Sequence, residues 1–325
     1  MKFLYVYDLE NKHIGYLREL IDQGIELDHV TSLELEKVTP GEYQGLICGF
    51  IPEKFLREAV DLKYFVIPFA GIPQKNRSVL ERYPDITVMN SHFNSRFVAE
   101  HGWALLLASS KKIVYSHEKL KVGDWTPHYD FQHSQSLEGK TLLLLGYGHL
   151  GREITRFARA FDMRVEAIKR TPSQDSSLDF LGTPEELHSR LPLADFIMVL
   201  LPMTDETTNF LDREEFALMK DGVILINIGR GEVINEGALY HALDTGKLGG
   251  VALDTWWIYP ESKEGYGNTM PSEYPFHLHD NVIFSPHRSA HVEIRESTRM
   301  RSVANILNSI YQGEPVKTVD INRGY

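Results

Sequence analysis

Three glycines with the spacing of a dinucleotide-binding turn are the first residues in this chain that point to chemistry. Gly146, Gly148 and Gly151 follow the apolar run "TLLLL" and lead into the helix-like stretch "REITRFARAF". The first glycine allows a tight turn, the second admits a pyrophosphate close to the backbone, and the third lets helix and strand pack closely. The pyrophosphate would lie on the free N–H groups of the helix start, beside His149 and Leu150. We therefore expect a bound dinucleotide, although related motifs also bind S-adenosylmethionine.

The residues after the next strand-like run, "RVEAI", indicate which dinucleotide is bound. About twenty residues past such a turn, an acid normally binds the ribose 2′-hydroxyl of NAD. Lys169, Arg170 and Thr171 stand there instead. Two cations and a hydroxyl suit a 2′-phosphate, because arginine binds phosphate through two parallel hydrogen bonds and lysine adds a point charge. NADP is therefore favoured over NAD; in the alternative, both cations are solvated and Asp175 or Asp179 supplies the acid.

Composition and charge restrict the remaining function classes. The 325 residues are enough for two domains, and 42% hydrophobic with 24% charged residues is typical of globular proteins. The net charge of −11, without a long Lys/Arg cluster, argues against nucleic acid as a partner and favours a small molecule. The chain begins without a secretory pattern, and no apolar run approaches membrane-spanning length, so we expect a cytoplasmic protein with no membrane partner.

The cysteine and histidine content predicts no metal site. Cys48 is the only cysteine, which excludes a disulfide framework and a thiolate metal site. Its place in "GLICG" is typical of a buried, inert strand thiol. The fourteen histidines are scattered without ligand spacing, and the pair in "HLH" (His277 and His279) falls in a loop-like stretch.

Short apolar runs that alternate with helix-like segments must position these residues. The runs are "FLYVY", "GLICG", "YFVIP", "TLLLLG", "RVEAI", "FIMVLL", "GVILIN", "GGVALD" and "NVIFSP". This alternation predicts an α/β protein with parallel sheets and helical crossovers.

Two longer helical segments divide the strands into two sets. One covers residues 94–116, and the other runs from about residue 291 to Gly313, with Pro315 behind it. If both segments cross between domains, the C-terminal tail completes the first domain. We therefore predict a substrate domain of residues 1–100 and 293–325, a dinucleotide-binding domain of residues 101–292, and a ligand site between them.

Several stretches together resemble one family, the D-isomer-specific 2-hydroxyacid dehydrogenases. They are "VAEHGWALLLAS", "SLEGKTLLLLGYGHLGREI", "LPLADFIMVLLPMTDETTNFL", "MKDGVILINIGRGEVINEGALYHALDTGKLGGVALD" and "NVIFSPH", and the likeness spans residues 65–310. It implies a Rossmann-type doubly wound domain inserted in a smaller flavodoxin-like α/β substrate domain. It also implies a homodimer that uses NAD(P) to interconvert 2-oxo acids and D-2-hydroxy acids.

The resemblance also assigns roles to individual residues. Arg230 in "NIGRGEVI" would bind the substrate carboxylate, and His287 in "SPH" would be the acid/base. Both residue types suit these tasks, because an anionic 2-oxo acid favours a bidentate cation and a developing alkoxide needs a proton donor that titrates near neutral pH. The less favoured alternatives are a surface turn charge for Arg230 and a hydrogen-bonded loop histidine for His287, since Arg230 stands at the C-terminal end of a strand, where α/β sites lie.

Four further residues take their roles from the resemblance alone. Gly71 and Ile72 in "FAGI" would offer backbone N–H groups to the substrate carboxylate. Asp254 would hold the nicotinamide carboxamide, and Pro202 in "LLPMT" joins the cofactor-binding set.

At Tyr259 the chain departs from the family pattern. The family usually has a glutamate here, five residues after the Asp254 equivalent, which orients the histidine and raises its pKa. A phenol brings no negative charge, so we expect His287 to have a lower pKa than in a Glu-paired relative. Formate dehydrogenases of the same fold carry a glutamine at this position and transfer hydride without a proton. Glu261 or Glu264 is an alternative partner.

The substrate and even the function class stay open at this point. Phe50, Ile51, Pro68 and Phe69 would line an apolar side-chain wall, but we favour core packing for them, as for the tryptophans in "DTWWIYP". Glyoxylate, hydroxypyruvate, pyruvate and larger 2-oxo acids all fit. Two other hypotheses are a dinucleotide-sensing protein with little turnover and a dehydrogenase that abstracts hydride from a small anion.

Overall fold

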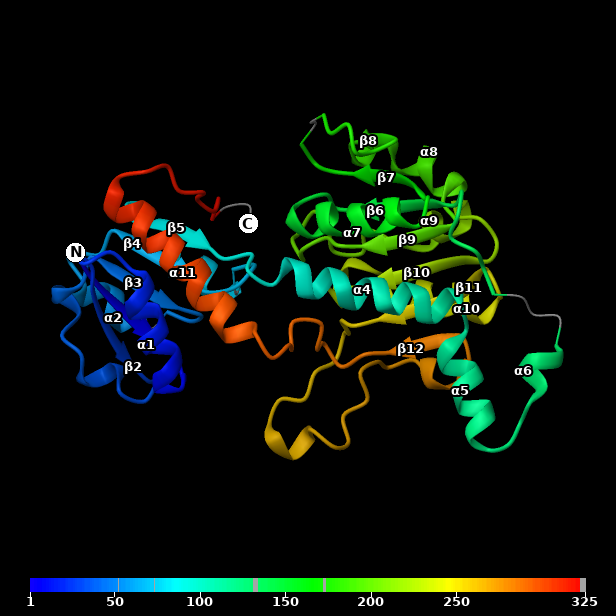
Figure 1. Ribbon diagram of the computed structural model, residues 1–325, viewed down its shortest axis with the longest axis horizontal. Coiled ribbons are helices and arrows are strands. Elements are labelled where there is room, and N and C mark those ends of the chain that lie inside the picture. Colours follow the sequence, from blue (N-terminus) through cyan, green and yellow to red (C-terminus); the bar gives the residue numbers. More distant parts are fainter. Residues whose placement is uncertain (52, 73, 131–133, 172–173, 322–325) are drawn as a thin grey trace. The chain divides into compact units, whose positions relative to one another are not determined.

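The computed structural model describes residues 1–51, 53–72, 74–130, 134–171 and 174–321, with the backbone alone for residues 74 and 75. The chain forms two compact units, residues 1–94 with 291–325 and residues 95–290. The predicted boundaries were 100/101 and 292/293. Figure 1 shows both units, and each is described here by itself.

The first unit is built on a parallel sheet in the order β2-β1-β3-β4-β5. Its strands are β1 (Lys2–Val6), β2 (Glu26–Val30), β3 (Gly45–Cys48), β4 (Tyr64–Ile67) and β5 (Thr87–Asn90). This is the flavodoxin-like order, so the fold predicted for the substrate domain is confirmed.

Helices cover both faces of this sheet because successive strand residues point to opposite sides. Phe3 and Tyr5 pack towards α1 (Asn11–Leu20) and α11 (Arg295–Gln312). Leu4 and Val6 pack towards the opposite face, which carries α2 (Glu53–Glu58) and α3 (Gln74–Leu80). Helix α11 therefore completes the first unit, and it ends as predicted, at a left-handed Gly313 with φ of 71°.

The second unit contains a longer parallel sheet in the order β12-β11-β10-β9-β6-β7-β8. Its strands are β6 (Thr141–Leu145), β7 (Arg164–Ile168), β8 (Phe180–Gly182), β9 (Phe196–Val199), β10 (Val223–Asn227), β11 (Leu248–Leu253) and β12 (Val282–Phe284). The strand order reverses between β6 and β9, as in a doubly wound Rossmann sheet with one added strand. The predicted dinucleotide-binding fold is confirmed, and its switch point lies beside the glycine turn.

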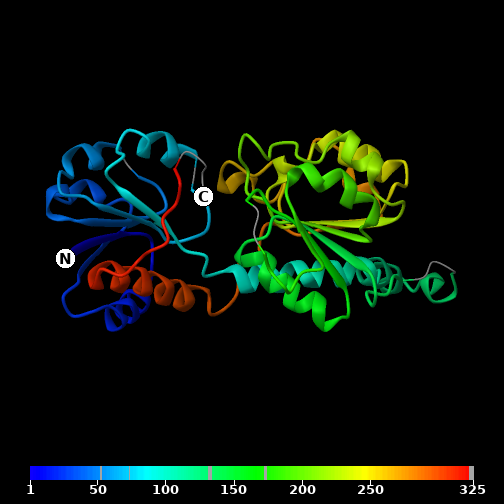
Figure 2. The same cartoon turned by 90° about the horizontal axis from the view of Figure 1, so that it is seen from above.

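Helices again lie on both faces of the second sheet (Figure 2). Leu142 and Leu144 pack towards α4 (Ser95–Ser110) and α7 (His149–Ala160), whereas Leu143 and Leu145 pack on the opposite face. That face carries α8 (Leu187–Arg190), α9 (Arg213–Leu218) and α10 (Glu236–Asp244). Both faces of the central strands are thereby buried, which accounts for their continuous apolar sequences.

The helix predicted over residues 94–116 is two helices. Helix α4 stops at Ser110, α5 (Ile113–Lys121) follows, and α6 (Thr126–Tyr129) comes next. Lys112 has a left-handed backbone with φ of 52°, which breaks the helix. Two backbone carbonyls at the end of α4 accept hydrogen bonds from residues outside the helix. The carbonyl of Ser110 accepts from the amide of Gln135, and the carbonyl of the next residue, Lys111, accepts from the hydroxyl of Ser134.

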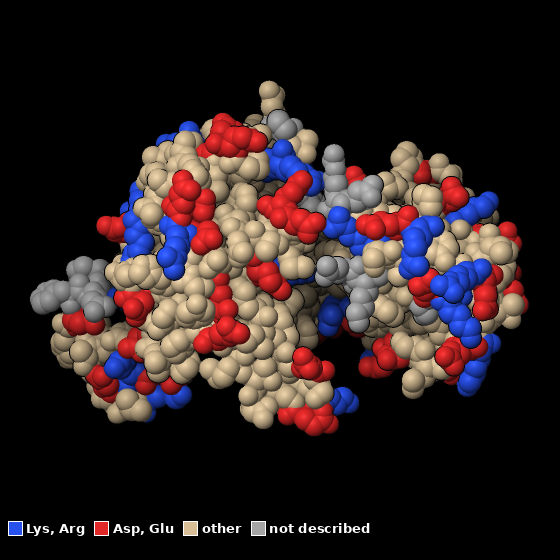
Figure 3. Space-filling view, turned by 180° about the vertical axis from the view of Figure 1, so that it is seen from behind, with Lys and Arg blue, Asp and Glu red and all other residues tan. Residues whose placement is uncertain are grey.

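The surface and interior carry no sign of a membrane span or a metal centre within the described ranges. On the face drawn in Figure 3, basic side chains lie among acidic ones, with uncharged surface between them. No described helix is long and apolar enough to cross a membrane, and no described group of three His, Cys, Asp or Glu residues could hold a metal ion. Cys48 is buried in β3, as predicted, and burial raises the pKa of its thiol to about 12.

Candidate active site

The glycine turn between β6 and α7 has the geometry that its sequence predicts. Gly146 has φ of 102°, and a Cβ there would lie 3.3 Å from the backbone carbon of Leu200. A Cβ at Gly151 would lie 3.2 Å from the carbonyl oxygen of Gly146, whereas a Cβ at Gly148 would meet nothing within 4 Å. The turn is therefore packed at its two ends and open in the middle, where a pyrophosphate would approach the helix start at His149.

Across the switch point from this turn lies the loop that contains Pro202. Pro202 follows β9, which pairs with β6, so both loops leave the same edge of the sheet. The hydroxyl of Thr207 donates to the carbonyl oxygen of Pro202 at 2.7 Å and accepts from the amide of Thr204 at 2.8 Å. The loop is thereby fixed by its own side chains opposite the glycine turn.

Lys169 and Arg170 follow β7 directly, at the same edge of the sheet. The amide of Lys169 donates to the carbonyl oxygen of Gly182 at 2.8 Å, which extends the pairing of β7 with β8. The guanidinium of Arg170 lies 3.5 Å from the carboxylate of Glu206, and its side chain is one-third exposed. Thr171 is exposed. These residues stand where the ribose of a dinucleotide would lie in this fold.

The two acids considered as alternatives have other partners. Asp179 accepts from the amide of Val165 at 2.7 Å and pairs with Arg159 at 2.8 Å, near the start of β7. It therefore lies at the opposite end of the strand from Lys169. Asp175 accepts from the hydroxyl of Tyr147 at 2.9 Å. Asp179 is thus remote from the residues that follow β7, whereas Asp175 lies beside the glycine turn through its bond to Tyr147.

A glycine on each side of Arg230 shapes the turn that presents it after β10. A Cβ at Gly229 would lie 2.6 Å from the carbonyl oxygen of Leu201, and a Cβ at Gly231 would lie 2.4 Å from that of Trp256. Both contacts are too close for any other residue to fit without displacing backbone. The Arg230 side chain is exposed, and its guanidinium donates to the carbonyl oxygen of Gly229. The turn packs tightly while its cation faces outward.

His287 and Tyr259 form a hydrogen-bonded pair. The Tyr259 hydroxyl lies 3.0 Å from His287 Nδ1, and it accepts from the amide of Trp256 at 3.2 Å. Glu261 and Glu264 are both exposed, and Glu264 bonds to Ser262. Tyr259, and neither loop glutamate, therefore occupies the position of the family's glutamate beside the histidine.

The Tyr259 hydroxyl stays neutral in this setting. Burial raises its pKa above the ordinary value, although the amide of Trp256 and the charge of Arg230 act in the opposite direction. A neutral phenol beside Nδ1 can donate or accept a hydrogen bond, but it does not stabilise an imidazolium as a carboxylate would.

Asp254 is fully buried at the end of β11 and is surrounded by protein donors. It accepts from the hydroxyl of Ser285, from the amides of Arg288 at 3.0 Å and Ser289 at 3.2 Å, and lies 3.5 Å from His101 Nε2. Burial alone would raise the pKa of the carboxyl, but these hydrogen bonds outweigh it and keep the pKa well below its usual value. The carboxylate has no exposed surface to offer a nicotinamide in this conformation, so the predicted carboxamide contact would need one of these donors to move.

His101 and Ser285 were not singled out from the sequence, yet both contact the site. His101 Nε2 lies 2.8 Å from the Ser285 hydroxyl, although 184 residues separate them along the chain. No local pattern marks either residue, and the one available signal is that Ser285 precedes the "PH" motif. The two adjacent tryptophans are packing residues, as expected: Trp256 donates to the carbonyl of Ser285, and Trp257 to that of Ile234.

The predicted substrate-binding backbone belongs to the first unit. Gly71 and Ile72 follow β4, at the carboxyl edge of its sheet, and Gly71 has φ of 83°. Of the four apolar residues considered as a substrate wall, Ile51 and Pro68 are buried and Phe69 packs on the core, whereas Phe50 is 56% exposed.

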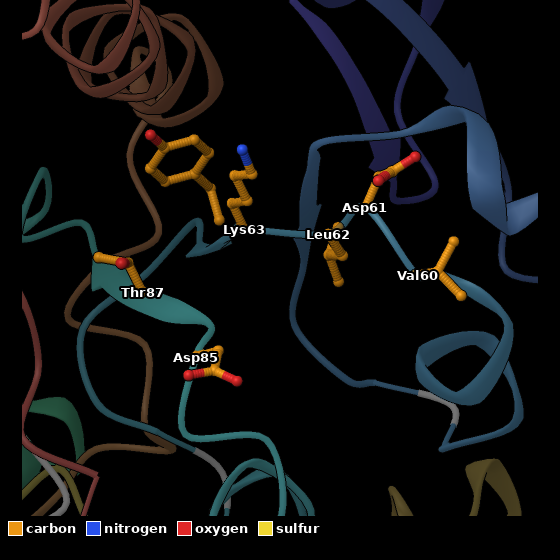
Figure 4. A pocket seen from close by; sticks show the side chains of 7 residues that line it. Val60, Asp61, Leu62, Lys63, Asp85 and Thr87 are labelled. Carbon is orange, nitrogen blue, oxygen red and sulfur yellow. The ribbon is translucent and has the colours of Figure 1, made fainter.

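A surface hollow in the first unit lies at the opposite edge of the same sheet (Figure 4). It is lined by Val60, Asp61, Leu62, Lys63, Tyr64, Asp85 and Thr87. Tyr64 and Thr87 are the first residues of β4 and β5, so the hollow lies at their amino ends and away from Gly71.

Comparisons with known proteins identify the family of this chain. The family model described as "D-isomer specific 2-hydroxyacid dehydrogenase, NAD binding domain" matches residues 103–289. A hydroxypyruvate reductase of Thermotoga maritima is 32% identical over 81% of this chain and 83% of its own. A D-3-phosphoglycerate dehydrogenase of Methanocaldococcus jannaschii is 32% identical over 98% of this chain, which spans 59% of that protein's length.

A solved structure shows the same fold over the whole length. The D-isomer specific 2-hydroxyacid dehydrogenase of Xanthobacter autotrophicus Py2, in complex with NADPH and MES, superposes with a TM-score of 0.82. It is 23% identical and covers 99% of each chain.

Proposed function

The chain belongs to the D-isomer-specific 2-hydroxyacid dehydrogenase family, and we propose that it interconverts a small 2-oxo acid and its D-2-hydroxy acid by hydride transfer, with NADP(H) as the favoured cofactor. The cofactor supplies or takes up the hydride, and the protein positions and polarises the substrate. Reductases of hydroxypyruvate and glyoxylate are among its relatives, so a short 2-oxo acid is the proposed substrate class.

The arrangement of Arg230 and the Tyr259–His287 pair carries this proposal. They follow β10, β11 and β12, which are adjacent parallel strands, and so they leave the same edge of the sheet as the glycine turn after β6. In open α/β sheets, ligands bind outside this edge. A guanidinium would bind the substrate carboxylate there, while the imidazole donates a proton to the oxygen that becomes the alkoxide.

The donors around Tyr259 determine which nitrogen of His287 carries the proton. The Tyr259 oxygen already accepts from the amide of Trp256, so its single hydrogen is best used on His287 Nδ1. The neutral imidazole then carries its hydrogen on Nε2. This tautomer can hydrogen-bond a substrate carbonyl through Nε2, and the imidazolium, which carries a hydrogen on both nitrogens, is the form that transfers a proton in the reductive direction.

The cations at the ribose edge support NADP(H). Lys169 and Arg170 follow β7 directly, Asp179 is held near the start of that strand, and Asp175 bonds to Tyr147 in the glycine turn. Gly71 and Ile72 of the first unit are proposed to add backbone N–H groups at the substrate carboxylate. A homodimer is proposed on the family likeness alone.

The direct test is turnover with a panel of 2-oxo acids, from glyoxylate to phenylpyruvate, followed by nicotinamide absorbance with NADPH and NADH in parallel. We expect reduction, faster with NADPH at equal concentration. Binding of a dinucleotide without turnover of any 2-oxo acid would contradict the reductase and favour the sensing hypothesis.

Removing the two ribose-edge cations should reverse the cofactor preference. In the K169A/R170A double variant, we expect the KM for NADPH to rise roughly 100-fold or more, since two charge-assisted hydrogen bonds are lost and each is worth about 1.5–3 kcal/mol. The KM for NADH should stay nearly constant. Arg164→Ala, at the exposed start of β7, is the matched control. An equal rise in the KM for NADPH and for NADH would show that these residues do not recognise the 2′-phosphate.

Replacing Tyr259 with glutamate should move the pH dependence of reduction. A carboxylate beside Nδ1 stabilises the imidazolium and raises its pKa, so activity that needs the protonated histidine should persist to higher pH, by roughly one pH unit or more. The measurement is kcat against pH. Tyr259→Phe removes the hydrogen bond without adding charge, and Tyr266→Glu adds the same charge at an exposed site in the same loop. If kcat of Tyr259→Glu depends on pH as in the parent chain, the residue at position 259 does not orient His287.

A further inference from the structure

The segment that carries His287 is fastened to one buried carboxylate. Asp254 accepts from the Ser285 hydroxyl on one side of His287, and from the amides of Arg288 and Ser289 on the other. The amide of His287 itself donates to the carbonyl oxygen of Ser285 at 3.0 Å. Ser285 is held further by its neighbours, since its amide donates to the carbonyl oxygen of Leu253 at 2.9 Å and its own carbonyl accepts from the Trp256 indole at 2.8 Å.

The backbone of His287 makes this anchoring necessary. Its φ is 51°, in the left-handed region that residues other than glycine adopt at a cost. Such a conformation persists where the surrounding contacts enforce it. The three hydrogen bonds to Asp254 supply those contacts, and they set the direction in which the imidazole leaves the chain.

The hydrogen bonds from Ser285, Arg288 and Ser289 to Asp254 form an anchor for the segment, and His101, on α4, adds to this anchor from outside it. The Ser285 hydroxyl has a single hydrogen, and it donates that hydrogen to Asp254, which as a carboxylate can only accept. His101 Nε2, at 2.8 Å, must therefore be the donor to the Ser285 oxygen. The same nitrogen lies 3.5 Å from the Asp254 carboxylate. His101 thus polarises Ser285 and partly compensates a charge that is fully buried.

We propose that His101 is a positioning residue for the reaction: through Ser285 and Asp254, it holds the left-handed segment that aims His287 at the substrate. This role rests on the proposed function of His287. His101 touches neither substrate nor cofactor in this scheme, and its effect passes entirely through the hydrogen bonds of the anchor.

The kinetic test compares two substitutions at position 101. His101→Leu removes the donor, and kcat for 2-oxo acid reduction should fall on the order of 10- to 100-fold, because a small misplacement of a reacting group is that costly. The KM for the oxo acid should change little, since Arg230 is untouched. His101→Gln keeps an N–H donor at the end of a similar reach, and it should recover most of kcat.

His188→Leu is the matched control. His188, on α8, also makes a 2.8 Å hydrogen bond, to Glu215 on α9. Its loss should leave kcat unchanged. Loss of kcat in His188→Leu as large as in His101→Leu would overturn the proposal, because it would show a general effect of removing a histidine.

Amide hydrogen exchange tests the anchor without any turnover. In the full-length apo protein, exchange at Arg288 and Ser289 should be faster in His101→Leu than in the parent chain, and close to the parent rate in His101→Gln. If His101→Leu does not fold, Ser285→Ala breaks the same link and should show the same acceleration. Unchanged exchange, or faster exchange with unchanged kcat, would overturn the positioning role. A parent chain that reduces no 2-oxo acid while exchange responds as expected would instead contradict the proposed function.

Discussion

Replacing His287 with asparagine is expected to lower kcat for 2-oxo acid reduction on the order of 10³-fold, within the range of general acid catalysis. In the proposed mechanism the imidazole is the proton donor to the developing alkoxide, so its loss leaves hydride transfer without an accompanying proton transfer. Asparagine is chosen because it tolerates the left-handed backbone at this position, where φ is 51°. The loss can then be assigned to chemistry and not to strain.

Cofactor binding supplies the control for this variant. The glycine turn and the ribose-edge cations follow other strands of the sheet, so the Kd for NADPH should stay within about twofold to threefold of the parent value. A kcat within tenfold of the parent would contradict acid catalysis. In that case the hydride-abstracting alternative gains weight, and it predicts no solvent isotope effect on the chemical step.

Most of the fold could be predicted because its central strands are buried on both faces. The runs around Leu143, Ile197 and Leu225 are continuously apolar, which is the signature of a strand in a covered parallel sheet. The strands that were not predicted are β2, β5 and β8, and all three lie at sheet edges. These three strands are partly exposed and lack a continuous apolar run, whereas the edge strand β12 keeps the run in "NVIFSP" and was predicted.

Some residues of the candidate site could be predicted from their neighbours in the sequence, whereas others depend on contacts between residues far apart in the chain. Gly146, Arg230 and Tyr259 lie in local motifs from which a role could be predicted. The surroundings of Asp254 could not be predicted, because its donors come from a helix that begins at Ser95 and from a loop more than thirty residues later. A residue type and a strand end show where an acid lies, but only the folded chain shows that its oxygens are already engaged.

Replacing Arg230 with glutamine is expected to lower kcat/KM for the 2-oxo acid about 10³-fold, corresponding to about 4 kcal/mol. Two charge-assisted hydrogen bonds to the substrate carboxylate would be lost, and each is worth about 1.5–3 kcal/mol. The KM should rise because the carboxylate is bound in the ground state, and kcat should fall because the carbonyl is no longer held against the cofactor.

Arg230→Lys separates charge from geometry in this prediction. Lysine keeps the positive charge but loses the planar fork, so it should recover only part of the activity. Arg213→Gln removes an exposed arginine from the start of α9 in the same unit and should have no effect. If Arg230→Gln kept kcat/KM within tenfold of the parent, the cation between Gly229 and Gly231 would be a turn charge, and the tight packing of both glycines would then serve the loop and not the substrate.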